Sequence, residues 1–211
     1  MSTVRASDHG SLVVEVLRCT ACRLCLHRKN VVIARGPASA PLMLVGEAPG
    51  ECEDRQGRPF VGPSGQLLDR LLARAEIPPE SIYICNAVKC RPPANRDPSP
   101  GELKSCRSWL LGQIRLVRPH VILTAGRTAT TAVTATYGPM GVLLSHRDLV
   151  CRFCDQPIPV VPLYHPAYLL RRLHDKTSGP VFTDTVARLR RAWVGANSVT
   201  AVEEAETHVF H

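Results

Sequence analysis

The cysteines offer the clearest chemistry in this sequence, because several are spaced as metal ligands are. Cys19, Cys22 and Cys25 are separated from one another by two residues each, and thiolates so close in sequence converge on one ion or cluster. Far along the chain, Cys90 and Cys106 form a second pair. Two thiolates from the first group and this pair together predict an all-cysteine site with four ligands. The spacing leaves both zinc and an iron–sulfur cluster open as its occupant.

A loop rich in glycine and acidic residues is a second place for chemistry. It follows an apolar run at residues 41–45 that predicts a buried strand, and it precedes an apolar stripe at residues 67–72 that predicts a helix. In α/β folds, ligands bind at loops that follow the carboxyl ends of parallel strands. We therefore predict a site that includes Glu47. A long surface connection with ordinary turn residues is the alternative.

His165 stands in a comparable position, just after the predicted strand at residues 158–163. Pro166 predicts that a helix starts there, since proline fits the first helical turn. We expect the imidazole to lie over the same edge of the sheet as Glu47. A surface histidine with satisfied hydrogen bonds is the alternative.

The remaining pattern predicts one α/β domain in which strands and helices alternate. Further strands are predicted at residues 81–88 and 120–125. Helices are predicted to start near Pro100 and to cover residues 127–135 and 182–196. The prolines that follow Cys90 exclude a helix there and predict a rigid, basic loop.

Two further segments complete the predicted organisation. Residues 142–153 are expected to be extended, with an antiparallel partner at 158–163. Cys151 and Cys154 lie two residues apart, but no second pair remains to complete a zinc site, so we interpret them as strand thiols. We expect a single domain over residues 1–196 and a frayed tail over residues 197–211.

The charge of the chain indicates the class of partner. The 211 residues carry a net charge of +8, which favours a polyanion, nucleic acid first, although a role in solubility is the alternative. The sequence has no apolar run long enough to span a membrane and no signal-peptide pattern, which predicts a cytoplasmic protein. In a reducing compartment, nine cysteines argue against a disulfide framework.

Four short motifs together carry a resemblance. They are Gly46-Glu47-Ala48-Pro49-Gly50, Gly57-Arg58-Pro59-Phe60-Val61-Gly62, Asn86-Ala87-Val88-Lys89-Cys90-Arg91-Pro92-Pro93 with Asn95-Arg96, and His165-Pro166-Ala167-Tyr168-Leu169-Leu170-Arg171. In this order and spacing they resemble the family 4 uracil-DNA glycosylases, the thermostable-type enzymes that carry an iron–sulfur cluster. The similarity runs from about Cys19 to Trp193.

The resemblance implies a three-layer α/β/α sandwich around a four-stranded parallel sheet. It implies a DNA repair enzyme that flips uracil out of DNA and hydrolyses its N-glycosidic bond, which leaves an abasic site. It also implies a 4Fe–4S cluster with a structural role, and we expect a monomer. The positions that match the cluster ligands are Cys19, Cys22, Cys90 and Cys106. Cys25 has no counterpart among them.

The resemblance also implies a role for each residue around the base. Phe60 would stack on uracil, and the amide of Asn86 would pair with uracil O4 and N3–H, a pattern that mispairs with cytosine. His165 would lie near O2 and stabilise the charge that builds on the leaving uracilate. Glu47 would position water or stabilise the oxocarbenium-like sugar. The predicted uracil-binding set is completed by Gly46, Ala48 and Glu53.

The segment after His165 is expected to contact the DNA. Apolar Tyr168 or Leu169 would fill the gap that the flipped base leaves, as intercalating side chains do. Arg171 and Arg172 would contact phosphates, so binding should weaken as salt rises.

The sequence departs from the family at several positions. Cys52 stands where relatives commonly have glutamate, and Asp148 replaces the glycine of a basic element, which leaves that DNA contact unassigned. A basic insertion through which a related branch forms a covalent adduct with abasic DNA is absent, so we expect ordinary turnover. The alternative function is a non-catalytic or suicide-type binder of uracil-containing or abasic DNA. The cysteines left without a predicted role are Cys25, Cys52, Cys85, Cys151 and Cys154.

Overall fold

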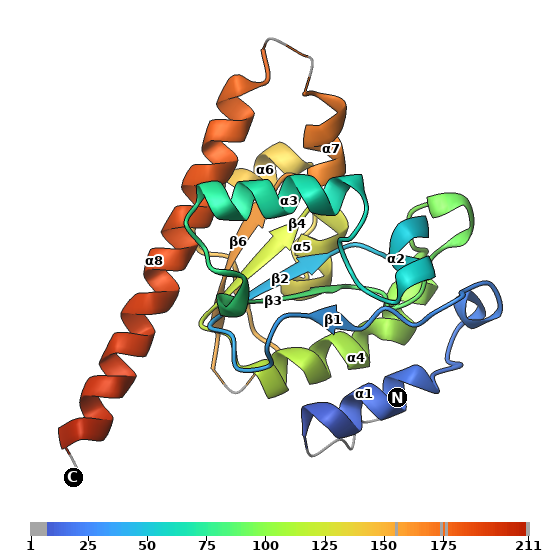
Figure 1. Cartoon of the computed structure of the whole chain (residues 1–211), viewed down its shortest axis with the longest axis horizontal. Coiled ribbons are helices and arrows are strands. Elements are labelled where there is room, and N and C mark those ends of the chain that lie inside the picture. Colours follow the sequence, from blue (N-terminus) through green and yellow to red (C-terminus); the bar gives the residue numbers. More distant parts are fainter. Residues whose placement is uncertain (1–7, 155, 174, 176, 210–211) are drawn as a thin grey trace.

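A central β-sheet lies between two layers of helices in this protein (Figure 1). The structure is a computed structural model that describes residues 8–209 apart from residues 155, 174 and 176. The predicted three-layer α/β/α sandwich is confirmed.

The sheet contains the four predicted parallel strands and a two-residue antiparallel strand at each edge. Its order is β1-β3-β2-β4-β6-β5. The parallel strands are β3 (Ile82–Asn86), β2 (Leu42–Gly46), β4 (Val121–Ala125) and β6 (Ile158–Leu163). The edge strands are β1 (Ala34–Arg35) and β5 (Val150–Cys151). The sequence did not predict β1, because two residues carry no periodic pattern.

Each face of the sheet packs against its own helices, so the protein has two main cores. The first core includes residues of α3 (Pro63–Arg74), α7 (Pro166–Arg171) and α8 (Gly179–Val209), and the second includes residues of α4 (Pro100–Val117) and α5 (Arg127–Thr134). Leu42 and Leu44 of β2 belong to the first core, and Met43 and Val45 to the second. Burial on both faces explains why the strands are continuous apolar runs.

The N-terminal segment packs outside the sandwich, on α4. Leu12 and Val16 of α1 (His9–Leu17) form a small cluster with Trp109 of α4. α4 itself begins at a capping box, in which Ser99 Oγ accepts the N–H of Glu102 and the carboxylate of Glu102 accepts the N–H of Ser99. The short helices are η1 (Arg23–Leu26), α2 (Glu51–Gln56), η2 (Pro79–Ser81), η3 (Pro93–Asn95) and α6 (Met140–Ser145).

Two predicted segments are wrong. Residues 142–145 are not extended, because α6 begins after Pro139 and turns Leu143 and Leu144 into buried positions. The last helix does not end at Ala196, since α8 continues to Val209; fraying of this segment stays a prediction. Residues 197–209 contain no glycine or proline that would stop the helix. Residues 210–211 of the predicted tail lie outside the described residues.

Among the residues that the structure describes, none of the helices, α8 included, combines the length and the hydropathy needed to cross a bilayer.

Candidate active site

The carboxyl ends of the parallel strands meet at one edge of the sheet, and the predicted site residues gather there. Glu47 follows β2, Asn86 ends β3 and His165 follows β6. The chain passes from β3 across β2 to β4, so this edge includes a switch point of the kind at which α/β folds bind ligands. A cavity of about 440 Å³ opens here. The predicted residues that line it are Glu47, Ala48, Glu53, Phe60, Asn86, His165, Tyr168 and Arg171.

Gly46 allows the aromatic ring and the amide of this cavity to approach each other. It lies directly beside Asn86 in the register of β2 and β3. A Cβ atom at Gly46 would lie 2.4 Å from Asn86 Oδ1 and 2.5 Å from Phe60 Cζ, well inside ordinary contact distance. Only glycine therefore fits between these two side chains. Asn86 is 2% exposed and Phe60 is 6% exposed, so neither can easily move away.

Glu53 holds the backbone around Phe60. The φ angle of Phe60 is 53°, in the left-handed region that is uncommon for residues other than glycine. Both carboxylate oxygens of Glu53 are engaged, because they accept N–H groups at 2.8 to 3.1 Å from Gly50, Val61 and Gly62. These are the contacts of a residue that positions the aromatic ring. A direct contact between Glu53 and uracil stays a prediction.

His165 is held as a neutral imidazole at the start of α7. Its Nδ1 accepts the N–H of Ala167 at 3.1 Å. Burial lowers the pKa of His165 to about 4; Arg171 lowers it too, whereas Glu53 opposes the shift. Because Nδ1 accepts a hydrogen bond, we assign the single proton of the neutral ring to Nε2, which can then donate to a ligand. The His165 and Phe60 ring centroids are 6.2 Å apart.

Glu47 is the partly buried carboxylate of the cavity. Burial raises its pKa, a hydrogen bond from Thr128 and the charge of Arg127 lower it, and Asp97 raises it. Thr128 and Arg127 belong to the first turn of α5, directly after β4. Sequence reasoning missed Thr128, although its place just past the carboxyl end of a parallel strand is the signal that identified Glu47.

The segment expected to contact DNA is only partly available for that role. Leu169 is fully buried in the first core, so it would have to leave that core to contact DNA, and its role as a DNA contact stays a prediction. The guanidinium of Arg172 bonds the hydroxyl of Tyr168 and the carboxylate of Asp175. Tyr168 and the exposed Arg171 line the cavity and remain the side chains that could reach a bound strand.

Arg96 is a cavity residue for which the sequence predicted no role. It lies in the proline-rich loop, and its guanidinium donates to the two carboxylate oxygens of Glu102 at 2.7 and 2.8 Å. That pairing lowers the pKa of Glu102 to about 2. The loop carrying Arg96 is thus fastened to the N-terminus of α4, which places a cation in the lining of the cavity. The basic, proline-rich composition of this loop was the available signal.

A second, smaller cavity gathers the cysteines of the predicted metal site. Its lining includes Cys19, Cys22, Cys25, Cys90 and Cys106. The packing of α1 on α4 brings the N-terminal cysteines to Cys106, which lies on α4, and to Cys90, which lies in the loop after β3. Cys25 lines the same cavity as the residues that match the family's ligands.

N–H donors point at three of these sulfur atoms. The pairs are Trp109 Nε1 with Cys19 Sγ at 3.2 Å, Arg28 Nη1 with Cys90 Sγ at 3.1 Å, and the backbone N–H of Lys89 with Cys106 Sγ at 3.3 Å. Burial raises the pKa of Cys90 and of Cys106, the latter to about 12, whereas Arg28 and Lys89 favour the respective thiolates. Ligation of a cation would therefore release protons from these thiols.

The thiols of this cavity are donors of the type that both zinc and iron–sulfur clusters use. Within the described residues, no three His, Cys, Asp or Glu side chains lie close enough to hold one metal ion. Tetrahedral zinc needs Zn–S distances of about 2.3 Å, which brings its sulfur ligands into mutual contact. A 4Fe–4S cluster is held by four cysteine thiolates, and the lining of this cavity supplies that donor set. Donors aimed at the sulfur atoms suit such a group as well.

The other cysteines lie away from this cavity. Cys85 and Cys151 are buried in the second core. Cys151 belongs to β5, which confirms its interpretation as a strand thiol, whereas Cys154 lies in a bend after that strand, so the same interpretation is wrong for it. Cys52 lies in α2.

Comparison with known proteins identifies the family. Residues 33–190 match the model of the uracil DNA glycosylase superfamily. The chain belongs to this superfamily. The Type-4 uracil-DNA glycosylase of Thermotoga maritima is 41% identical over 175 residues, which cover 80% of this chain and 86% of the relative. That of Sulfurisphaera tokodaii is 39% identical over 160 residues, which cover 74% and 73%. A Type-5 uracil-DNA glycosylase of Pyrobaculum aerophilum is 32% identical over 173 residues, which cover 74% and 73%.

The uracil-DNA glycosylase match contains the whole candidate site, from Gly46 to Arg171, and it also contains Cys90 and Cys106. Cys19 and Cys22 precede the matched residues. The cysteine cavity therefore includes residues of the matched range and residues of the N-terminal segment that precedes it. The resemblance stated from the four motifs is confirmed.

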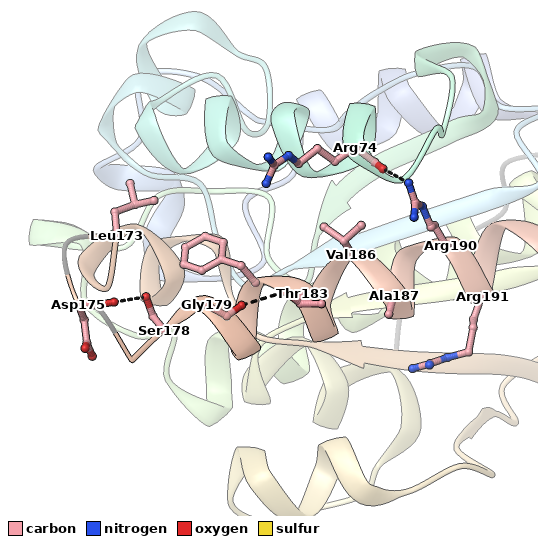
Figure 2. A pocket seen from close by; sticks show the side chains of 11 residues that line it. Arg74, Leu173, Asp175, Ser178, Gly179, Thr183, Val186, Ala187, Arg190 and Arg191 are labelled. Carbon is pink, nitrogen blue, oxygen red and sulfur yellow. Dashed lines mark hydrogen bonds between the residues drawn. The ribbon is translucent and has the colours of Figure 1, made fainter.

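A larger hollow lies away from the site of this uracil-DNA glycosylase superfamily member. It has a volume of about 960 Å³ and runs beside α8 near the end of α3 (Figure 2). Leu173 and Phe182 supply apolar lining, and Arg74, Arg190 and Arg191 supply basic side chains. It contains none of the predicted catalytic or base-binding residues. Cavity size alone would thus misplace the active site.

Proposed function

We propose that this protein is a uracil-DNA glycosylase, which flips uracil out of DNA and hydrolyses its N-glycosidic bond to leave an abasic site. One observation carries the proposal. An aromatic ring, a buried amide and a neutral imidazole, those of Phe60, Asn86 and His165, converge on one cavity at the carboxyl edge of the sheet. The superfamily match and the identity to Type-4 enzymes support the same activity.

Recognition of the base follows from the chemistry of these groups. A base inside a duplex must leave the stack before an enzyme can reach it. The ring of Phe60 offers a stacking surface, which holds any base. The amide of Asn86 offers one acceptor and two donors, which match the N3–H and O4 of uracil and oppose the pattern of cytosine. Selectivity therefore depends on the position of Asn86 more than on any other side chain of the cavity.

As the N-glycosidic bond breaks, negative charge builds on the base and positive charge on the sugar, and both charges need stabilisation. As the N-glycosidic bond breaks, its electron pair moves to the uracil ring, and Nε2–H of His165 would donate to O2, where negative charge develops. A neutral imidazole suits this role, because it stabilises the anion without a full positive charge in a buried site. The carboxylate of Glu47 would face the sugar, where it can stabilise positive charge and orient the attacking water.

Contacts to the DNA backbone are proposed at the rim of the cavity. Arg96 and Arg171 line the cavity, and Tyr168 stands beside them as an aromatic side chain that can fill the vacated space. Arginines that neutralise phosphates release counterions, so affinity should fall as salt rises. The monomeric state and the cytoplasmic location remain predictions from the sequence.

We propose further that the cysteine cavity holds a 4Fe–4S cluster through Cys19, Cys22, Cys90 and Cys106. When bound, the cluster would cross-link the N-terminal segment, the loop after β3 and α4, which is a structural contribution. The chain's own N–H donors to three of the sulfur atoms support this assignment. Purified protein should be brown and absorb visible light; colourless protein that contains zinc would reject the cluster.

The decisive test of activity uses a labelled oligonucleotide with one uracil, followed by alkaline cleavage of abasic sites. The wild-type protein should produce the shorter strand. Glu47→Gln should lower the single-turnover rate by at least about 100-fold, within the range that positioned catalytic groups contribute. Glu80→Gln, an exposed site in η2, is the matched control and should keep the wild-type rate. No cleaved strand at high protein concentration, with tight binding to the same DNA, would favour the non-catalytic binder instead.

A further inference from the structure

A buried lysine lies in the loop that joins Asn86 to Cys90, and its ammonium has no part in the proposed reaction. Lys89 is 1% exposed and lines the cysteine cavity. It follows Asn86 by three residues. A lysine is rarely buried unless its ammonium is paired, so its partners show what it does.

The side chain of Lys89 folds back beneath its own loop. Its Nζ donates to the backbone carbonyl of Asn86 at 2.5 Å, and the side chain also hydrogen-bonds the thiol of Cys85. The main chain of Lys89 is fixed independently, because its N–H contacts Cys106 Sγ at 3.3 Å and its carbonyl accepts the N–H of Val32 at 2.8 Å. The ammonium thus holds a peptide group that lies three residues earlier.

That peptide group carries the amide proposed to recognise uracil. On the β2 side, the N–H groups of Ala87 and Val88 donate to the carbonyls of Gly46 and Glu47 at 2.8 and 3.1 Å. From its own loop, the ammonium of Lys89 donates to the carbonyl of Asn86. Without the ammonium this buried carbonyl would lose that hydrogen bond, and the peptide plane could rotate toward another donor.

We propose that Lys89 is a positioning residue, which fixes the main chain of Asn86 so that its side-chain amide faces uracil. This inference rests on the proposed uracil-DNA glycosylase function. Lys89 also connects the cysteine cavity to the cavity proposed to bind uracil, since it contacts Cys106 through its N–H and Asn86 through its Nζ.

The test replaces the ammonium with an apolar group of similar length, Lys89→Met. Lys104→Met is the matched control, because Lys104 is exposed on α4. With the wild type active, Lys89→Met should lower the single-turnover excision rate by about 10- to 100-fold, the effect of removing one hydrogen bond between a charged donor and a buried acceptor. The Kd for uracil-containing DNA should stay within about threefold, since phosphate contacts dominate affinity. Lys104→Met should match the wild type in both measurements.

A double-mutant cycle separates positioning from a merely structural role. If Lys89 acts through Asn86, then Lys89→Met should have little further effect on the rate in an Asn86→Ala background. Equal losses in both backgrounds, or wild-type activity of Lys89→Met, would overturn the inference while leaving the proposed function intact. If the wild-type protein itself did not excise uracil, the proposed uracil-DNA glycosylase function would be rejected instead.

Two further measurements keep the inference testable if Lys89→Met does not fold. Lys89→Gln keeps a donor on a shorter side chain and should be faster than Lys89→Met in any folded preparation. A crystal structure of the wild-type protein needs no variant: Nζ of Lys89 should lie within hydrogen-bonding distance of the Asn86 carbonyl. A side chain that points elsewhere would overturn the proposal.

Discussion

Substitution of alanine for Gly46 perturbs the site by one methyl group and gives a worked magnitude. The new Cβ would lie 2.4 Å from Asn86 Oδ1 and 2.5 Å from Phe60 Cζ, where nine in ten real contacts exceed 3.4 Å. Both side chains must therefore move by about 1 Å, a misplacement that can cost about 100-fold in rate. Overpacking of this kind also costs about 1–3 kcal/mol of stability, which lowers Tm by roughly 3–10 °C in a chain of this size.

The assay is single-turnover excision of uracil from an oligonucleotide, with Tm measured on the same preparations. Gly141→Ala is the matched control, because a Cβ atom there meets nothing within 4 Å, and it should keep the wild-type rate. Gly46→Ala should stay folded and lose about two orders of magnitude in rate. If a folded Gly46→Ala protein cleaved within about threefold of the wild type, the ring and the amide could not both be needed where the structure places them.

Three other predictions follow from the same geometry. Asn86→Asp should abolish uracil excision, because an ionised carboxylate repels uracil O4; unchanged excision in the oligonucleotide assay would refute the reading role. His165 has a pKa of about 4, and the pKa of Glu47 is raised. The excision rate should therefore be constant from about pH 6 to 8 and fall toward lower pH, because each group gains a proton below its pKa. A rate that rises between pH 8 and 6 would instead indicate an imidazolium. Cys106→Ala should lose visible absorbance and thermal stability, and its excision rate should be affected less. The control Cys151→Ala, in β5, should keep its absorbance. Equal absorbance of the two variants would exclude Cys106 as a ligand.

The central sheet and the location of the site could be predicted from sequence because they depend on local signals. Continuous apolar runs mark strands that are buried on both faces, and the residue after each run necessarily lies at the carboxyl edge of a parallel sheet. Glu47 and His165 were found in this way, whereas Asn86 lies inside the predicted strand at residues 81–88 and was identified only by the resemblance to the family. The cysteine spacing likewise indicated that thiols from distant segments would meet, as they do around one cavity.

What could not be predicted depends on contacts between distant or unremarkable residues. The hydrogen bonds from the backbone around Phe60 to Glu53 form only because α2 brings the Glu53 carboxylate there, and the sequence does not show that placement. The burial of Leu169 depends on the packing of α7 against the first core. The hydrogen bond from Lys89 to the Asn86 carbonyl could not be predicted, because the motif indicates only that a basic residue is present. The end of α8 was predicted too early for a different reason, because no glycine or proline after Ala196 indicates where the helix stops.

The central claim is that Phe60, Asn86 and His165 together hold an everted uracil. It is tested most directly by a crystal structure of the protein with free uracil. The account predicts uracil stacked on Phe60, with the Asn86 amide on O4 and N3–H and Nε2 of His165 on O2. Uracil bound elsewhere, or bound in this cavity without contact to Asn86 and His165, would contradict it.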